Sequence, residues 1–256
     1  MDLGITGKRA LVLGASRGLG KAIAQGLAAE GVTVFAAARS VDKISDYASN
    51  SDTLHPVKLD LGEITQVDRA VDDLLADGGV DIIVNNGGGP PPGAALTADR
   101  AAWLTHFEAM AANLFHMNAR LLPKMKERGW GRIISITSSG VEQPIPNLAL
   151  SNGIRSAVVG WSKTLANEVA ADGITVNVVM PGRIHTQRVD ELDAAAAKRT
   201  DTDVAEVAAK SRATIPAGRY GKPEEFADVV TFLASERAGY VTGSKIRIDG
   251  GSIKSI

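Results

Sequence analysis

A glycine-rich turn near the start of the chain has the composition of a phosphate-binding loop. Gly14, Gly18 and Gly20 form the pattern G-x-x-x-G-x-G after the apolar run Ala10–Leu13. Glycines allow a tight turn and a close approach to a ligand, and the following helix offers its free N–H groups and positive dipole end to a pyrophosphate. The spacing differs from the common G-x-G-x-x-G fingerprint. The turn therefore predicts a dinucleotide site, and a plain turn is the alternative.

Two arginines indicate which dinucleotide this site prefers. A carboxylate at the end of the second strand selects NAD, whereas a nearby arginine accommodates the 2′-phosphate of NADP. The run Thr33–Ser40 contains no acid before Asp42, while Arg17 lies in the glycine turn and Arg39 at the strand end. Two guanidinium groups near one spot suit a phosphate, although each alone is consistent with a surface charge. The sequence predicts NADP (NADPH) as the cofactor.

These residues need a scaffold, and the pattern of elements predicts one. Short apolar runs alternate with longer segments of helical periodicity, which is typical of a parallel sheet covered by helices on both faces. We expect an α/β fold, a Rossmann-type doubly wound parallel sheet in a single domain, with ligands at the carboxyl ends of the strands. The expected strands are Arg9–Leu13, Thr33–Ala37, Leu54–Lys58, Ile82–Val84, Arg132–Thr137, Thr175–Val179 and Lys245–Ile248, and the expected helices are Leu19–Glu30, Thr65–Ala76, Asp99–Leu121, Leu148–Ala171 and Glu224–Ala234.

One segment outside this alternation, residues 187–215, is rich in alanine and charged residues. We expect it to form one or two small helices that cover the substrate side as a lid. A plain solvated helix is an equally good interpretation. The single domain is expected to span residues 1–256.

Composition excludes several function classes. The chain has 256 residues, of which 45% are hydrophobic and 22% charged, enough for one large domain with a sizeable core. The net charge is −1, so the chain has no excess of basic residues and no nucleic-acid partner is expected. With no cysteine and four dispersed histidines, neither thiol chemistry nor a metal site is expected. No run reaches membrane-spanning length and no apolar signal core is visible, so we expect a cytoplasmic protein.

The glycine turn is the first of an ordered series of motifs. In order, the others are Asp60-Leu61, Asn85-Asn86-Gly87-Gly88, Gly131–Ser138, Asn177–Thr186, Gly218–Glu225, Thr242-Gly243 and Asp249–Gly251. By this set the sequence resembles the short-chain dehydrogenase/reductase family over essentially its whole length, and within it the bacterial 3-oxoacyl-carrier-protein reductases. The resemblance implies an oxidoreductase that acts on a small carbonyl or alcohol substrate. It also implies a homotetramer that pairs the helices expected at Asp99–Leu121 and Leu148–Ala171.

The resemblance further implies a set of cofactor-binding residues. They are Gly14, Ser16, Arg17, Gly18, Leu19, Gly20, Arg39, Asp60, Leu61, Asn86, Gly87, Gly88, Arg155, Pro181, Gly182, Ile184 and Thr186. Two of them have simpler interpretations. Asn86 is also a common turn former before glycines, and Asp60 is also consistent with an ordinary strand-end carboxylate.

The sequence departs from the family at the active site. The spacing from Ser138 places Ser151 and Arg155 where the family has Tyr-x-x-x-Lys, and Met110 where it has an asparagine, with Asn113 one turn further on. The chain thus resembles an atypical subgroup. An arginine can hold ribose hydroxyls but donates no proton near neutral pH, and an aliphatic hydroxyl is a far weaker acid than a phenol. The missing general acid is typically worth ~10²–10⁴-fold in rate.

The expected catalytic residues are therefore Ser138, Ser151, Arg155 and His185. Ser138 would bind the reacting oxygen, although a strand-end serine also satisfies backbone groups. The proton would come from a water held in the space left at Ser151, or from His185, since an imidazole serves as acid or base at cellular pH. An exposed loop histidine is the simpler interpretation of His185.

Two functions remain open on this sequence. The first is an NADP-dependent oxidoreductase with a remodelled proton-donor site. The second is a catalytically impaired nucleotide-binding sensor or scaffold of the same ancestry. Retention of Ser138 and a cationic Arg155 favours the enzyme, whereas loss of the tyrosine favours the sensor.

Overall fold

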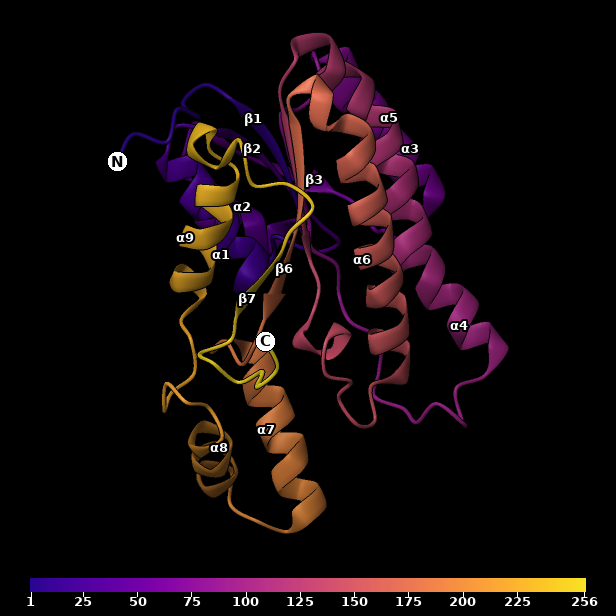
Figure 1. Ribbon diagram of the computed structural model, residues 1–256, viewed down its shortest axis with the longest axis vertical. Coiled ribbons are helices and arrows are strands. Elements are labelled where there is room, and N and C mark those ends of the chain that lie inside the picture. Colours follow the sequence, from indigo (N-terminus) through magenta and orange to yellow (C-terminus); the bar gives the residue numbers. More distant parts are fainter.

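A computed structural model describes residues 1–256 and contains one seven-stranded sheet in the order β3-β2-β1-β4-β5-β6-β7 (Figure 1). Every neighbouring pair of strands is parallel. The order reverses between β1 and β4, which is the doubly wound arrangement that the alternating pattern predicts. The strands are β1 (Arg9–Leu13), β2 (Thr33–Ala38), β3 (Leu54–Lys58), β4 (Ile82–Asn85), β5 (Gly131–Ile136), β6 (Ile174–Pro181) and β7 (Lys245–Ile248).

Helices cover both faces of the sheet because successive strand side chains point to opposite sides and are apolar on both. On one face, α1 (Gly18–Ala29) and α9 (Pro223–Leu233) pack on each other and on the sheet. On the other face, α3 (Ile64–Ala76), α5 (Asn113–Arg128) and α6 (Ala149–Val169) form a second apolar cluster with the sheet. Figure 1 shows these two layers on the left and right of the strands.

The strands expected from the sequence are confirmed, but one long helix is not continuous. The segment expected at Asp99–Leu121 divides into α4 (Arg100–Phe107), a π-helical turn η1 (Glu108–Ala112) and α5. In a π-helix each hydrogen bond spans one residue more, so the helix bulges, and such bulges are frequent at functional sites. Apolar periodicity does not reveal this change, because α4 buries none of its residues and η1 buries only Met110 and Ala111.

A short helix, α2 (Asp42–Ala48), was not expected from the sequence. Only Ile44 and Ala48 of its seven residues are buried, so its apolar pattern is too brief to stand out. The remaining short turns are η2 (Ser139–Val141), η3 (Ala170–Asp172) and η4 (Glu236–Ala238).

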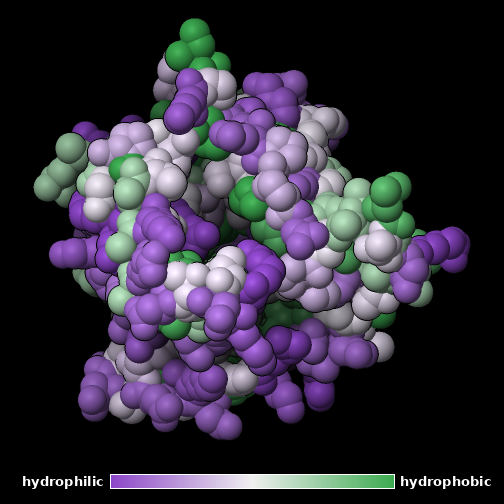
Figure 2. Space-filling view, turned by 90° about the horizontal axis from the view of Figure 1, so that it is seen from below, coloured by the Kyte–Doolittle hydropathy of each residue, from purple (hydrophilic) through white to green (hydrophobic).

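Two helices, α7 (Gln187–Thr200) and α8 (Val204–Ala213), extend below the carboxyl ends of the strands (Figure 1). Both lie within residues 187–215, the segment for which the sequence predicts one or two helices. Figure 2 looks onto this end and shows a hollow with apolar surface at its base and polar side chains around it. None of the helices combines the length and apolarity that a membrane crossing requires.

Candidate cofactor and active site

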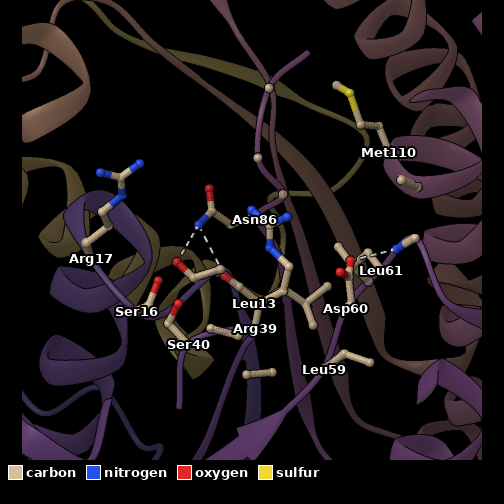
Figure 3. Close-up of a pocket in the computed structure, with 18 of the residues that line it drawn as sticks. Leu13, Ser16, Arg17, Arg39, Ser40, Leu59, Asp60, Leu61, Asn86 and Met110 are labelled. Carbon is tan, nitrogen blue, oxygen red and sulfur yellow. Dashed lines mark hydrogen bonds between the residues drawn. The ribbon is translucent and has the colours of Figure 1, made fainter. Parts of the chain in front are cut away.

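A cavity of about 510 Å³ lies at the carboxyl ends of β1 to β4. The glycine turn, the ends of β2 and β3, the loop after β4 and the π-turn η1 all contribute to its wall (Figure 3). Nine of the residues that the sequence predicts for cofactor binding line it, namely Gly14, Ser16, Arg17, Arg39, Asp60, Leu61, Asn86, Gly87 and Gly88. The other predicted cofactor residues lie outside this wall.

The glycine turn is held in place by Asn86. The side-chain amide of Asn86 donates to the carbonyl of Leu13 at 3.1 Å and approaches that of Gly14 at 3.5 Å (Figure 3). Gly14 has a φ of +62°, and a side chain there would overlap with the Asn86 backbone. A side chain at Gly20 would likewise overlap with the Gly14 carbonyl. Asn86 therefore does more than form its own turn, because it locks the glycine turn in shape.

This turn fits the diphosphate of a dinucleotide. Glycine at positions 14 and 20 lets the backbone fold tightly against itself and against Asn86, and α1 begins at Gly18 with no side chain capping its first N–H groups. Unpaired N–H groups at a helix N-terminus are a common anion site. The donor set suits a phosphate, and the adjoining cavity of about 510 Å³ leaves room for one.

Three cations line the cavity, and one of them was missed in the sequence. Arg39 and Lys43 line it together with Ser40, and neither cation forms an ion pair. Lys43 lies on the unexpected helix α2, so its position was not predictable. Arg17 does not converge on Arg39, because its Nη1 lies 3.1 Å from Oε1 of Glu191 on α7. Figure 3 shows the two guanidinium groups apart.

The wall opposite the glycine turn is set by Asp60 and Asn113. The Asp60 carboxylate accepts the N–H of Gly62 at 3.0 Å, so it shapes its own loop as well as facing the cavity. The Asn113 side chain donates to the carbonyl of Leu61 at 2.7 Å. Met110, on η1, also lines the cavity. Asn113 therefore ties the π-turn region to the loop after β3, a role that its sequence position alone did not reveal.

Ser138 and Arg155 lie at the end of β5. Ser138 is the N-cap of η2, and its Oγ accepts the N–H of Gly140 at 3.1 Å. Arg155 donates from Nη1 to the carbonyl of Ile136 at 2.9 Å, and a Cβ on Gly89 would lie 3.9 Å from its Nη2. The guanidinium therefore lies between the strand end and the loop that lines the cofactor cavity.

Arg155 is a cation without a counter-ion. No carboxylate pairs with it, and burial lowers the pKa of its guanidinium to about 10. It stays protonated at neutral pH because that value is still well above 7. Ser151 lies one turn before it on α6, and η2 packs against the same helix. The structure thus places Ser138, Ser151 and Arg155 on two adjoining elements.

His185 lines a different cavity from the nine predicted cofactor residues named above. Its Nε2 is 3.3 Å from Oδ1 of Asp190, and its ring centroid is 6.2 Å from that of Tyr220. These residues line a space of about 350 Å³ that also includes residues of α8, and His185 is largely exposed at 66%. This placement gives His185 no contact with Ser138 or Arg155 that would support the hypothesis that it donates the proton.

Four of the remaining predicted cofactor residues, Pro181, Gly182, Ile184 and Thr186, lie at the end of β6 or in the loop after it. Thr186 lies against the glycine turn, since a Cβ on Gly18 would be 3.4 Å from its Cγ2. Gly182 is packed against Asp249 so closely that a side chain would overlap with it. Ile184 is buried and forms a bridge with Gly221. Pro181 ends β6, and Leu19 and Gly20 lie in the first turn of α1.

Comparison with known proteins identifies the family. Residues 14–252 match the family model described as Enoyl-(Acyl carrier protein) reductase. The 3-oxoacyl-[acyl-carrier-protein] reductase FabG of Escherichia coli is 36% identical over 252 residues, which cover 96% of this chain and 97% of that one. FabG of Haemophilus influenzae is 34% identical over 249 residues, covering 96% and 98%. L-Sorbose reductase from Gluconobacter frateurii, complexed with NADPH and L-sorbose, matches with a TM-score of 0.94 at 33% identity over 100% of both chains. The chain belongs to the short-chain dehydrogenase/reductase family.

Proposed function

We propose that this chain is an NADPH-dependent reductase of a small carbonyl compound, with a remodelled proton-donor site. The observation that carries the proposal is the position of Arg155. Its unpaired guanidinium contacts the end of β5 just before Ser138 and lies beside the glycine loop that lines the cofactor cavity. A carbonyl bound between the cofactor and Ser138 would therefore meet a positive charge.

The cofactor preference is supported by the cavity wall. Arg39 and Lys43 are unpaired cations there, Ser40 adds a hydroxyl, and no acid follows β2 before Asp42. A 2′-phosphate would receive charge-assisted hydrogen bonds from these groups. The relatives point the same way, since L-sorbose reductase was solved with NADPH and YwfH is described as an NADPH dependent reductase.

When bound, the nicotinamide supplies a hydride to the carbonyl carbon. Ser138 would orient the carbonyl oxygen, because its own oxygen already accepts the Gly140 N–H and its hydroxyl proton is free to be donated. Arg155 would hold the ribose hydroxyls and stabilise negative charge on the reacting oxygen, which is the effect of a preorganised cation.

The proton must come from another group. Ser151 stands in the first turn of α6 with a short polar side chain, and a polar gap of this kind suits an ordered water. We favour this water as the donor over His185, whose contacts are with Asp190 and Tyr220. Arg155 itself remains charged and does not serve as the acid near neutral pH.

The test is NADPH oxidation with a panel of carbonyls. The panel contains 3-oxoacyl thioesters and ketoses, the substrate classes named for the relatives. We expect at least one to be reduced, and Ser138→Ala to lower that rate by ~10²–10³-fold with NADPH binding unchanged. Ser156→Ala is the matched control, since this exposed serine bonds only to its own helix. Tight NADPH binding with no reduction of any compound would instead support the nucleotide-binding sensor or scaffold.

A further inference from the structure

The contact between Arg17 and Glu191 joins two elements that belong to different parts of the site. Arg17 is the N-cap of α1 and lines the cofactor cavity, whereas Glu191 lies on α7, below the strand ends. Their Nη1–Oε1 distance is 3.1 Å, and both side chains are half-exposed. In Figure 3 the Arg17 guanidinium is turned away from Arg39, the other predicted phosphate ligand. The carboxylate of Glu191 therefore pairs with Arg17, a cation that lines the cofactor cavity.

The position of Glu191 is fixed because its helix, α7, is anchored to neighbouring segments. Asp193, two residues on, is buried and accepts hydrogen bonds from Arg183 at 2.8 Å and from the hydroxyl of Tyr220 at 2.7 Å. At the start of the same helix, Thr186 packs against Gly18 of the glycine turn. Because α7 is anchored in this way, Glu191 is held at the mouth of the cavity rather than following Arg17 freely.

Glu191 also has a second cation within reach. Arg188, one turn earlier on α7, lies 3.6 Å from its other carboxylate oxygen. If Arg17 turned toward an anion in the cavity, Glu191 would keep this partner. The exchange of partners is therefore cheap, since neither charge is left isolated. A phosphate at the N-terminus of α1 carries more charge than a carboxylate and is favoured there by the helix dipole.

We propose that Glu191 competes with the cofactor phosphates for Arg17. It holds Arg17 in the cofactor-free protein and yields it to a cofactor phosphate, so that binding detaches this turn of α7 from the glycine turn. Cofactor binding and the attachment of α7 to the glycine turn are then coupled. Each must weaken the other by the same free energy. This inference rests on the NADPH binding proposed above.

The first experiment measures cofactor affinity by titration of NADPH and NADH into the cofactor-free protein at low salt. Exposed ion pairs contribute modestly, so Glu191→Gln should bind about two- to fivefold more tightly than the wild type. Asp190→Asn removes the same charge from the neighbouring position, which pairs with His185, and should leave affinity unchanged. In an Arg17→Ala background, Glu191→Gln should have no effect. Tightening for NADPH alone assigns Arg17 to the 2′-phosphate, and equal tightening for both assigns it to the diphosphate.

The second experiment measures hydrogen exchange of α7 without cofactor. Glu191→Gln and Arg17→Ala should raise exchange in the first turns of α7 to the same extent, because each breaks the same pair from opposite sides. A change caused only by the composition of α7 would not be reproduced by a substitution on α1. Unchanged affinity in Glu191→Gln, equal tightening in the Arg17→Ala background, or no response of α7 to Arg17→Ala would each overturn the inference. Failure of the wild type to bind NADPH would reject the proposed function and this inference together.

Discussion

At the scale of single residues, a substitution of Arg39 tests the choice of cofactor most directly. It lines the cavity without an acidic partner. If it holds the 2′-phosphate, Arg39→Ala should weaken NADPH binding by about 1.5–3 kcal/mol, the range for a hydrogen bond to a charged group. NADH lacks that phosphate and should bind almost as before. Lys58→Ala, at the end of β3 but outside this cavity, is the control for net charge. Equal losses for both cofactors would contradict the assignment.

The charge of Arg155 predicts the pH dependence of the reaction. Burial lowers the pKa of its guanidinium to about 10, so the stabilising charge is present at neutral pH and is lost as the pH rises through about 10. The rate of carbonyl reduction should fall over that range, and Arg155→Met should remove this fall along with most of the activity. Absence of the alkaline fall would contradict the role given to Arg155.

At the scale of elements, the start of α9 carries the clearest pH-dependent contribution to stability. Glu225 accepts two hydrogen bonds from Arg219 at 2.7 and 2.6 Å and one from the Lys222 N–H at 2.7 Å. The Arg219 hydrogen bond, followed by that of Lys222, lowers the pKa of Glu225 from 4.5 to about 2. The unfolded chain therefore takes up this proton first as the pH falls. The contribution is complete above about 4.5 and is lost toward pH 2.

Thermal unfolding tests this prediction. Glu225→Gln should unfold at a lower temperature than the wild type at pH 7, and the difference should shrink as the pH falls toward 2. Glu224→Gln is the matched control, because the neighbouring exposed acid has no ion-pair partner. A difference that persists unchanged at low pH would show that the carboxylate charge is not what stabilises this turn.

The same scale shows what the sequence predicts and what it does not. The strands were predictable because runs such as Ile82–Val84 are apolar on both faces and bounded by turns. The π-turn at Glu108–Ala112 was not, because α4 before it buries no residue and the turn itself buries only two, so no apolar pattern marks the change in hydrogen bonding. Lys43 escaped notice because its helix is short. The Arg17–Glu191 pair joins residues 174 positions apart, and only the folded chain brings them together.

At the scale of the whole molecule, we expect a homotetramer built by pairing of α5 and α6. These helices present a common face, on which Phe115 and Trp161 stack with ring centroids 4.6 Å apart and remain partly exposed. Gly160 lies beside Trp161 with open space where a side chain would be. Light scattering should give a tetramer for the wild type and a smaller assembly for Gly160→Arg, because a long charged side chain blocks close helix contact.

Ala205→Arg, an exposed position on α8, supplies the control for added charge and should stay tetrameric. A wild type that is monomeric at micromolar concentration would refute the expected assembly. A tetrameric Gly160→Arg variant would place the interface on another face.

The central claim is our proposal that this chain transfers a hydride from NADPH to a carbonyl bound at Ser138, in a site whose predicted members on α6 are Ser151 and Arg155. The most direct measurement uses NADPH carrying deuterium on the transferred position, with mass spectrometry of the product alcohol. We predict one deuterium on the former carbonyl carbon, formed at a rate that Ser138→Ala lowers by ~10²–10³-fold while NADPH binding is kept. Bound NADPH with no deuterium in any product, or transfer indifferent to Ser138→Ala, would contradict the account.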